Sequence, residues 1–116
     1  MSRDIEALQT ALRSFSNDRD WGQFHSPKNL AAALSVEAAE LLEHFQWLTE
    51  EQSRTLSEDK RMKVGEEVAD VLLYLLQLSD KLQIDVLDAA WKKLESNGSK
   101  YPVDKSKGNM KKYNEL

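Results

Sequence analysis

Acidic side chains recur three residues apart in two segments of the chain. The first pair is Glu37 and Glu40, and the second pair is Glu67 and Asp70. On a helix, residues three apart project from one face about one turn apart, so each pair can share a ligand. If the two helices pack antiparallel, as the length of their connection permits, all four carboxylates can face one cleft.

Four converging carboxylates repel one another and raise one another's pKa unless a cation neutralises them. Ligands that are all oxygen select hard ions, which here means Mg²⁺ or Mn²⁺, with Ca²⁺ as a further candidate. Magnesium in turn indicates phosphate chemistry, because it binds a few carboxylates together with waters and substrate phosphates. The same spacing also arises by chance in acidic helices whose carboxylates only face solvent.

A di-iron helical bundle is another use of inward-facing carboxylates, and it needs Glu-x-x-His on paired helices. Here His44 follows Glu40 by four residues, and the segment that carries Glu67 has no histidine. The spacing therefore argues against a di-iron centre.

Long helices joined by short loops are expected to position the carboxylates. The chain has four glycines and two prolines, and no alternating apolar and polar run predicts a strand. The first helix should be capped by Ser2 or Asp4 and end near Asn17. A second helix is expected over about 27–47, a short helix or turn before 58, a third helix over about 58–82, and a fourth from Asp85 to Asn97 and Gly98. The predicted fold class is all-α.

The second and third helices each carry an apolar arc that should form the core. The arcs are Leu30, Leu34, Ala38, Leu41, Phe45 and Leu48 in the second helix, and Val64, Val68, Val71, Leu75, Leu78 and Leu82 in the third. Arcs of this width are more than a monomer of this size can cover. A tightly oligomeric protein is therefore expected.

The composition limits the classes of protein to which the chain can belong. The 116 residues suit one domain, and the formal net charge of −4 gives no general attraction to a nucleic acid polymer. No cysteine is present, so thiolate metal sites and disulfides are excluded. The longest uncharged apolar run, 71–76, is far shorter than the ~20 residues that span a bilayer, and the N-terminus does not look like a signal peptide. A cytoplasmic protein without a membrane partner is expected.

Two segments outside the predicted long helices carry side chains that suit a ligand. The loop DRDWGQFHSP contains Trp21, Phe24 and His25, which a simple connector has little reason to expose. The segment from Lys100 onward contains five lysines and two acidic residues. This basic tail is either solvated and disordered or folded over an anionic group.

The acidic pairs, written E-A-A-E and E-V-A-D, resemble the EXXE…EXXD signature of the MazG-like all-α nucleotide pyrophosphohydrolases. The segments WGQFHSPKNL, SVEAAELLEHFQW, EEVADVLLYL and KYPVDKSKGNMKKY are similar to the dCTP pyrophosphatase branch of that family, and the similarity is nearly continuous from Trp21 to the C-terminus. The alanines of E-A-A-E depart from the glycines of the animal branch, which concerns helix packing more than chemistry.

The resemblance implies a four- to five-helix bundle assembled as a homotetramer, a dimer of dimers. It implies Mg²⁺-dependent hydrolysis of a deoxynucleoside triphosphate between the α and β phosphates, which yields a monophosphate and pyrophosphate and cleanses the nucleotide pool. Mn²⁺ is a substitute ion, and dCTP is the favoured substrate. The acidic pairs would be the metal ligands and catalytic groups. The residues matched to substrate binding are Trp21, His25, Trp47, Tyr74, Asn97, Lys100 and Tyr101, and the tail over about 98–116 would close over the site.

Other interpretations of these residues remain open. Trp47 and Trp91 can be ordinary core or oligomer contacts rather than ligand contacts. The chain as a whole can be a non-catalytic nucleotide-binding regulatory module, or a helical oligomerisation domain whose acidic pairs are solvated.

Overall fold

The structure is a computed structural model that describes residues 4–116. Within this range the chain forms six α-helices, two short 3-10 helices and no strand, so the all-α prediction is confirmed. The elements are α1 (Ile5–Asp18), η1 (Gly22–Phe24), α2 (Pro27–Glu43), α3 (Glu50–Arg54), α4 (Glu58–Lys81), α5 (Val86–Lys100), α6 (Val103–Ser106) and η2 (Tyr113–Glu115). They form two compact units, Met1–Gln83 and Ile84–Leu116, each described by itself.

Side-chain caps set where the helices begin. Asp4 caps α1 by accepting from the N–H of Ala7 at 2.8 Å, as predicted; Ser2 lies outside the described residues. Ser26 and Asp85 cap α2 and α5 in the same way, and Thr49 and Gln52 form a reciprocal capping box that begins α3.

Two helix ends differ from the prediction. The fourth long helix, α5, continues through Gly98 to Lys100. It ends where Tyr101 precedes Pro102, because a residue before proline disfavours helical backbone. The second long helix, α2, ends at Glu43 rather than near Trp47, and the chain continues through further turns.

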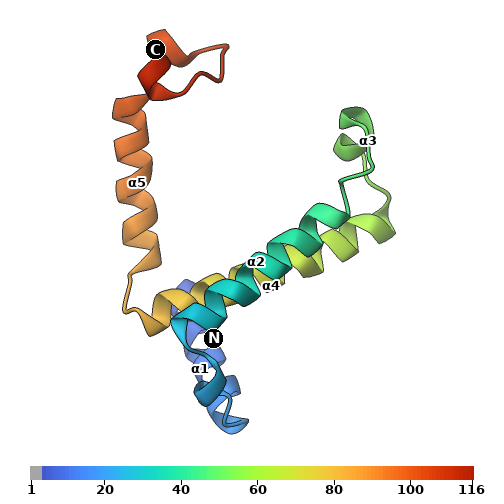
Figure 1. The fold of residues 1–116 in the computed structure, drawn as a ribbon, viewed down its shortest axis with the longest axis vertical. Coiled ribbons are helices and arrows are strands. Elements are labelled where there is room, and N and C mark those ends of the chain that lie inside the picture. Colours follow the sequence, from blue (N-terminus) through green and yellow to red (C-terminus); the bar gives the residue numbers. More distant parts are fainter. Residues whose placement is uncertain (1–3) are drawn as a thin grey trace. The chain divides into compact units, whose positions relative to one another are not determined.

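In the first unit, α2 and α4 lie side by side and run in opposite directions (Figure 1). Helix α1 contacts the C-terminal half of α4. Gln9 donates from Nε2 to the carbonyl of Leu76 at 3.2 Å, and the guanidinium of Arg13 donates to both carboxylate oxygens of Asp80 at 2.7 and 2.8 Å. These contacts fix α1 against the helix that carries Glu67 and Asp70.

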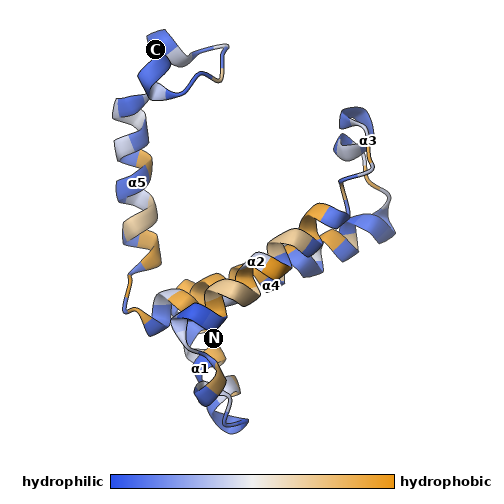
Figure 2. Cartoon of the chain, viewed as in Figure 1, coloured by the Kyte–Doolittle hydropathy of each residue, from blue (hydrophilic) through white to orange (hydrophobic). Residues whose placement is uncertain are grey.

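The predicted core of α4 is wrong in part. Its most buried hydrophobic side chain is Leu76, which is 1% exposed and was outside the predicted arc, whereas Val68, Leu75 and Leu82 are exposed. Apolar residues recur along α4 (Figure 2), and several of them are exposed while Leu76 is buried, so periodicity does not show which side packs against α1 and α2. The other side is not covered within the first unit.

None of the helices within residues 4–116 is both long and apolar enough to cross a bilayer.

Replacing Asp80 with Asn should loosen α1 from α4 and lower the thermal unfolding midpoint at pH 7. The Arg13 guanidinium beside Asp80 holds the pKa of this carboxyl below its ordinary value of 3.8. The ionised pair therefore stabilises the folded chain above that pH, and this contribution is lost as the pH falls through the lowered pKa. The difference in midpoint between the wild type and Asp80→Asn, followed by circular dichroism, should shrink in acid.

Asp59 provides a matched control because, within residues 4–116, its ion pair is with Lys63 of the same helix, at 3.3 Å. An exposed pair within one helix contributes little, so Asp59→Asn should leave the midpoint nearly unchanged. Equal effects of the two substitutions would contradict a role for Arg13 and Asp80 in holding α1.

Candidate functional site

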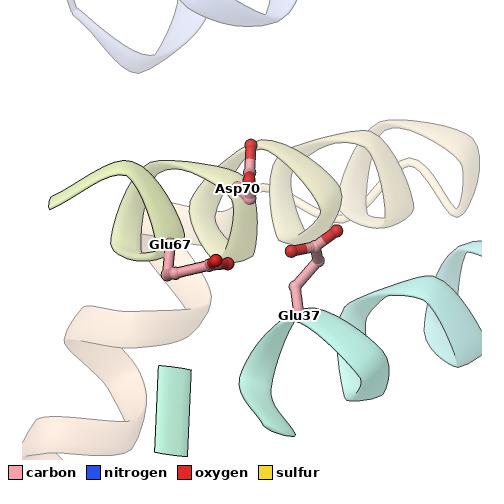
Figure 3. A group of neighbouring side chains, drawn as sticks. All are labelled: Glu37, Glu67 and Asp70. Carbon is pink, nitrogen blue, oxygen red and sulfur yellow. The ribbon is translucent and has the colours of Figure 1, made fainter. Parts of the chain in front are cut away.

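Three of the four predicted carboxylates converge between α2 and α4. Glu37 of α2, Glu67 and Asp70 each offer an oxygen, and these oxygens lie within 4.8 Å of one another. Figure 3 shows Glu37 reaching from α2 toward α4, where Glu67 and Asp70 lie on successive turns. Glu40 is outside this group of three, but it is close enough to Glu37 to affect its pKa.

Two buried carboxylate oxygens determine the electrostatics of this group. Oxygen Oε2 of Glu37 and Oε2 of Glu67 are buried and have no hydrogen-bond partner. Burial raises the pKa of Glu37 to about 7, with further contributions from Glu40, Asp70 and Glu67. Buried carboxylate oxygens without donors are costly unless a cation pairs with them.

The oxygen atoms of this group are suitable ligands for a hard divalent cation. All three converging groups are carboxylates, and two of them have buried oxygens without other partners. His44 also comes near, with Nε2 3.9 Å from Oε1 of Glu67. That distance exceeds a hydrogen bond, and the histidine is not part of the converging group.

The end of α1 directs an aromatic side chain toward the same region. Asp20 adopts a left-handed backbone with φ of +54°, and the N–H of Trp21 donates to the carbonyl of Ser16 at 3.0 Å. This is the Schellman pattern of helix termination, in which the following residue folds back on the last turn. The ring of Trp21 accordingly lies edge-on to Phe15, with 5.7 Å between centroids, and it also lies 6.3 Å from the ring of His25.

A cavity of about 340 Å³ opens between α1, the Trp21 loop and α4. Its walls include four of the predicted site residues, Trp21, His25, Asp70 and Tyr74. Apolar side chains from α1 and α4 form most of the remaining wall, among them Leu12. One carboxylate of the converging group thus borders an aromatic and apolar cavity.

The other predicted binding residues are not among those that line this cavity. Trp47 follows α2, is 87% exposed and does not line this cavity. Asn97, Lys100 and Tyr101 belong to the second unit, at the end of α5. There, the N–H of Tyr101 donates to the carbonyl of Asn97 at 2.9 Å.

The sequence did not point to several residues that line the cavity or pack against Tyr101. Phe15 and Gln77 line the cavity, and Gln77 could have been found because it follows Tyr74 by three residues on the same face of α4. Tyr113 packs edge-on to Tyr101 at 6.3 Å, and Lys100 lies 5.1 Å from its ring centre. No local pattern pointed to Tyr113, because this contact joins residues more than ten positions apart.

The raised pKa of Glu37 predicts a pH-dependent stability and metal affinity. Without metal, the folded state holds a proton on Glu37 between about pH 4.5 and 7 that the unfolded state releases. The contribution of this group to the unfolding free energy therefore falls as the pH rises through that window. A cation needs the ionised form, so Mg²⁺ should raise the thermal midpoint more at pH 8 than at pH 5.5.

Thermal unfolding with and without Mg²⁺ at the two pH values measures this effect. Glu37→Gln should remove most of the pH dependence of the Mg²⁺ response, whereas Glu66→Gln, on the exposed neighbour of Glu67, should retain it. An identical Mg²⁺ response of the wild type at both pH values would contradict the assignment.

Comparison with known proteins agrees with the resemblance seen in the two acidic pairs. Residues 32–116 match the model of the MazG-like family. The chain is 37% identical over 114 residues to dCTP pyrophosphatase 1 of Bos taurus, covering 97% of this chain and 68% of that protein. It is 36% identical to dCTP pyrophosphatase 1 of Homo sapiens, with 97% and 67% covered. A solved pyrophosphatase from Archaeoglobus fulgidus is 42% identical with a TM-score of 0.70, covering 88% of this chain and 95% of that one. The chain belongs to the MazG-like family.

Proposed function

We propose that the chain is a nucleoside triphosphate pyrophosphohydrolase that cleaves a deoxynucleoside triphosphate, with dCTP favoured, between the α and β phosphates. The products are the monophosphate and pyrophosphate, and the role is to cleanse the nucleotide pool. The observation that carries this proposal is the convergence of Glu37, Glu67 and Asp70 beside an aromatic cavity that Asp70 also lines. The names of the relatives, which are pyrophosphatases, support it.

The carboxylates hold the ion and position the attacking water. Bound Mg²⁺, or Mn²⁺ in its place, would neutralise phosphate oxygens and favour ionisation of a water molecule. Glu37, Glu67 and Asp70 would be the ligands, and Glu40 would either join them or, from its place beside Glu37, accept the proton of the water. A nucleotide that filled the cavity would displace water from the apolar side chains beside Asp70, which would strengthen these electrostatic interactions.

The cavity holds the base and the sugar. The face of Trp21 stacks on a base, a contact worth about 1–3 kcal/mol, while His25 and Tyr74 border the base and the sugar. Asn97, Lys100 and Tyr101, with the tail over about 98–116, would close over a nucleotide bound by this chain or by a neighbouring copy, and the lysines would offset triphosphate charge. In this proposal both units act as one domain, and a cytoplasmic location remains a prediction of the sequence.

Purified protein with Mg²⁺ should release pyrophosphate and dCMP from dCTP. Asp70→Asn should lower kcat/KM at least about 100-fold, since loss of residues that only support a metal ligand already costs 10- to 100-fold. Glu66→Gln is the matched control, because Glu66 is an exposed carboxylate of the same helix and should leave kcat/KM unchanged. Product analysis by anion-exchange chromatography distinguishes pyrophosphate from phosphate.

Release of inorganic phosphate and dCDP would contradict cleavage between the α and β phosphates. Binding of dCTP without product over hours would instead support a non-catalytic regulatory module. The absence of both turnover and a Mg²⁺ effect on stability would favour a simple oligomerisation domain.

We also propose that copies of this chain cover the bare side of α4 and form the expected homotetramer. A shallow groove along this helix, lined by Met62, Gly65 and Val68 among others, is largely apolar, and Val68 is 51% exposed. Gly65 costs about 1 kcal/mol relative to Ala inside a helix. A Cβ at Gly65 would meet nothing within 4 Å in this chain, so its small size suits the close approach of a second helix. Trp47 does not line the nucleotide cavity of its own chain. In the assembly it would instead contact the cavity of another copy.

Val68→Asp should shift the assembly toward smaller species by placing a charge in the buried contact. Lys63→Gln makes the same change in net charge at an exposed position of α4 and should leave the mass unchanged. Sedimentation velocity at micromolar concentration measures both variants. A monomeric wild type under these conditions would contradict the proposal.

A further inference from the structure

Gln77 is a polar side chain of the nucleotide cavity that the proposed mechanism does not use. It lies on α4, one turn beyond Tyr74 and two turns beyond Asp70, which is about 10 Å along the helix from that carboxylate. It also lines a second cavity of about 190 Å³, whose walls include Arg13 and Asp80. Gln77 therefore lies where the apolar cavity meets a second cavity whose wall contains an ion pair.

The amide of Gln77 has hydrogen-bonding capacity left for a ligand. Its Nε2 donates to the carbonyl of Leu73, one turn earlier, at 3.3 Å. This bond orients the amide, and no residue within the described range 4–116 bonds to Oε1. Most of the cavity wall nearby is apolar, including Leu12 and Leu73. A ligand edge that reaches this end would lose its water and needs a polar partner.

The side chains at the two ends of the cavity indicate which way a bound nucleotide would point. If the carboxylate end at Asp70 holds the metal and the phosphates, the base lies farther along α4, past Tyr74. Its faces then contact aromatic rings such as Trp21, which leaves its hydrogen-bonding edge directed away from the phosphates. Gln77 is the polar α4 side chain at that end of the cavity.

We infer that Gln77 reads the hydrogen-bonding edge of a pyrimidine base and sets the preference for cytosine over uracil. The inference rests on the proposed function, since it assumes that a nucleotide occupies this cavity. With Nε2 held by Leu73, Oε1 is the group offered to the ligand, and a carbonyl oxygen accepts from the 4-amino group of cytosine. The 4-carbonyl of uracil offers no donor at that place and would face Oε1 oxygen to oxygen.

The test compares dCTP with dUTP, because these substrates differ only at the edge that Gln77 is inferred to read. Gln77→Leu should lower the ratio of kcat/KM for dCTP to that for dUTP at least about tenfold. Gln77→Glu keeps an acceptor oxygen and should retain the preference for dCTP. Gln46→Leu, the same change at an exposed glutamine after α2, should leave the ratio unchanged, and circular dichroism verifies that each variant is folded.

The affinities of dCMP and dUMP, measured by calorimetry on the same variants, provide a readout that does not need turnover. If the wild type hydrolyses neither triphosphate, the proposed function fails, and the affinity ratio still decides the role of Gln77. Equal losses for the cytosine and uracil nucleotides in Gln77→Leu, or unchanged ratios, would overturn the inference. A loss of the cytosine preference in Gln77→Glu would also overturn it.

Discussion

The repulsion among carboxylates at the contact of α2 and α4 is the constraint on which the site depends. Packing of two antiparallel helices brings Glu37 against Glu67 and Asp70, and two of the oxygens are buried without a donor. In the chain alone this arrangement opposes folding at neutral pH, because ionised oxygens lose water and gain no partner. A bound divalent cation would offset that contribution, so the proposed metal site comes at the expense of metal-free stability.

The rest of the first unit forms the cavity in which the proposed substrate would lie beside these carboxylates. The link between Arg13 and Asp80 holds α1 on α4, and the Schellman end of α1 folds Trp21 back toward Phe15. The resulting cavity is lined by the carboxylate of Asp70, by aromatic rings and by the amide of Gln77, which lies farther along α4 than Asp70. In the proposed complex, these groups would face the phosphates, the sugar and the base in that order.

Sequence spacing predicted the helices and the acidic pairs because both depend on neighbours within one or two turns. Caps such as Ser26 and Asp85 gave correct starts, while Pro102 rather than Gly98 decided where α5 ends. Contacts between distant segments could not be predicted in this way. The pair of Arg13 and Asp80 is 67 residues apart, and the apolar residues around α4 left its rotation undefined, so Leu76 was missed as core. The exclusion of Glu40 from the closest group likewise depends on how α2 is rotated against α4.

Crystals grown with Mn²⁺ and a non-hydrolysable dCTP analogue would test the central claim most directly, because anomalous scattering locates Mn²⁺ without assumption. A peak is expected within coordination distance of oxygens of Glu37, Glu67 and Asp70, with the phosphates of the analogue bound to the same ion. An analogue bound in the crystal with no anomalous peak at these carboxylates, or with its phosphates held elsewhere, would contradict the claim.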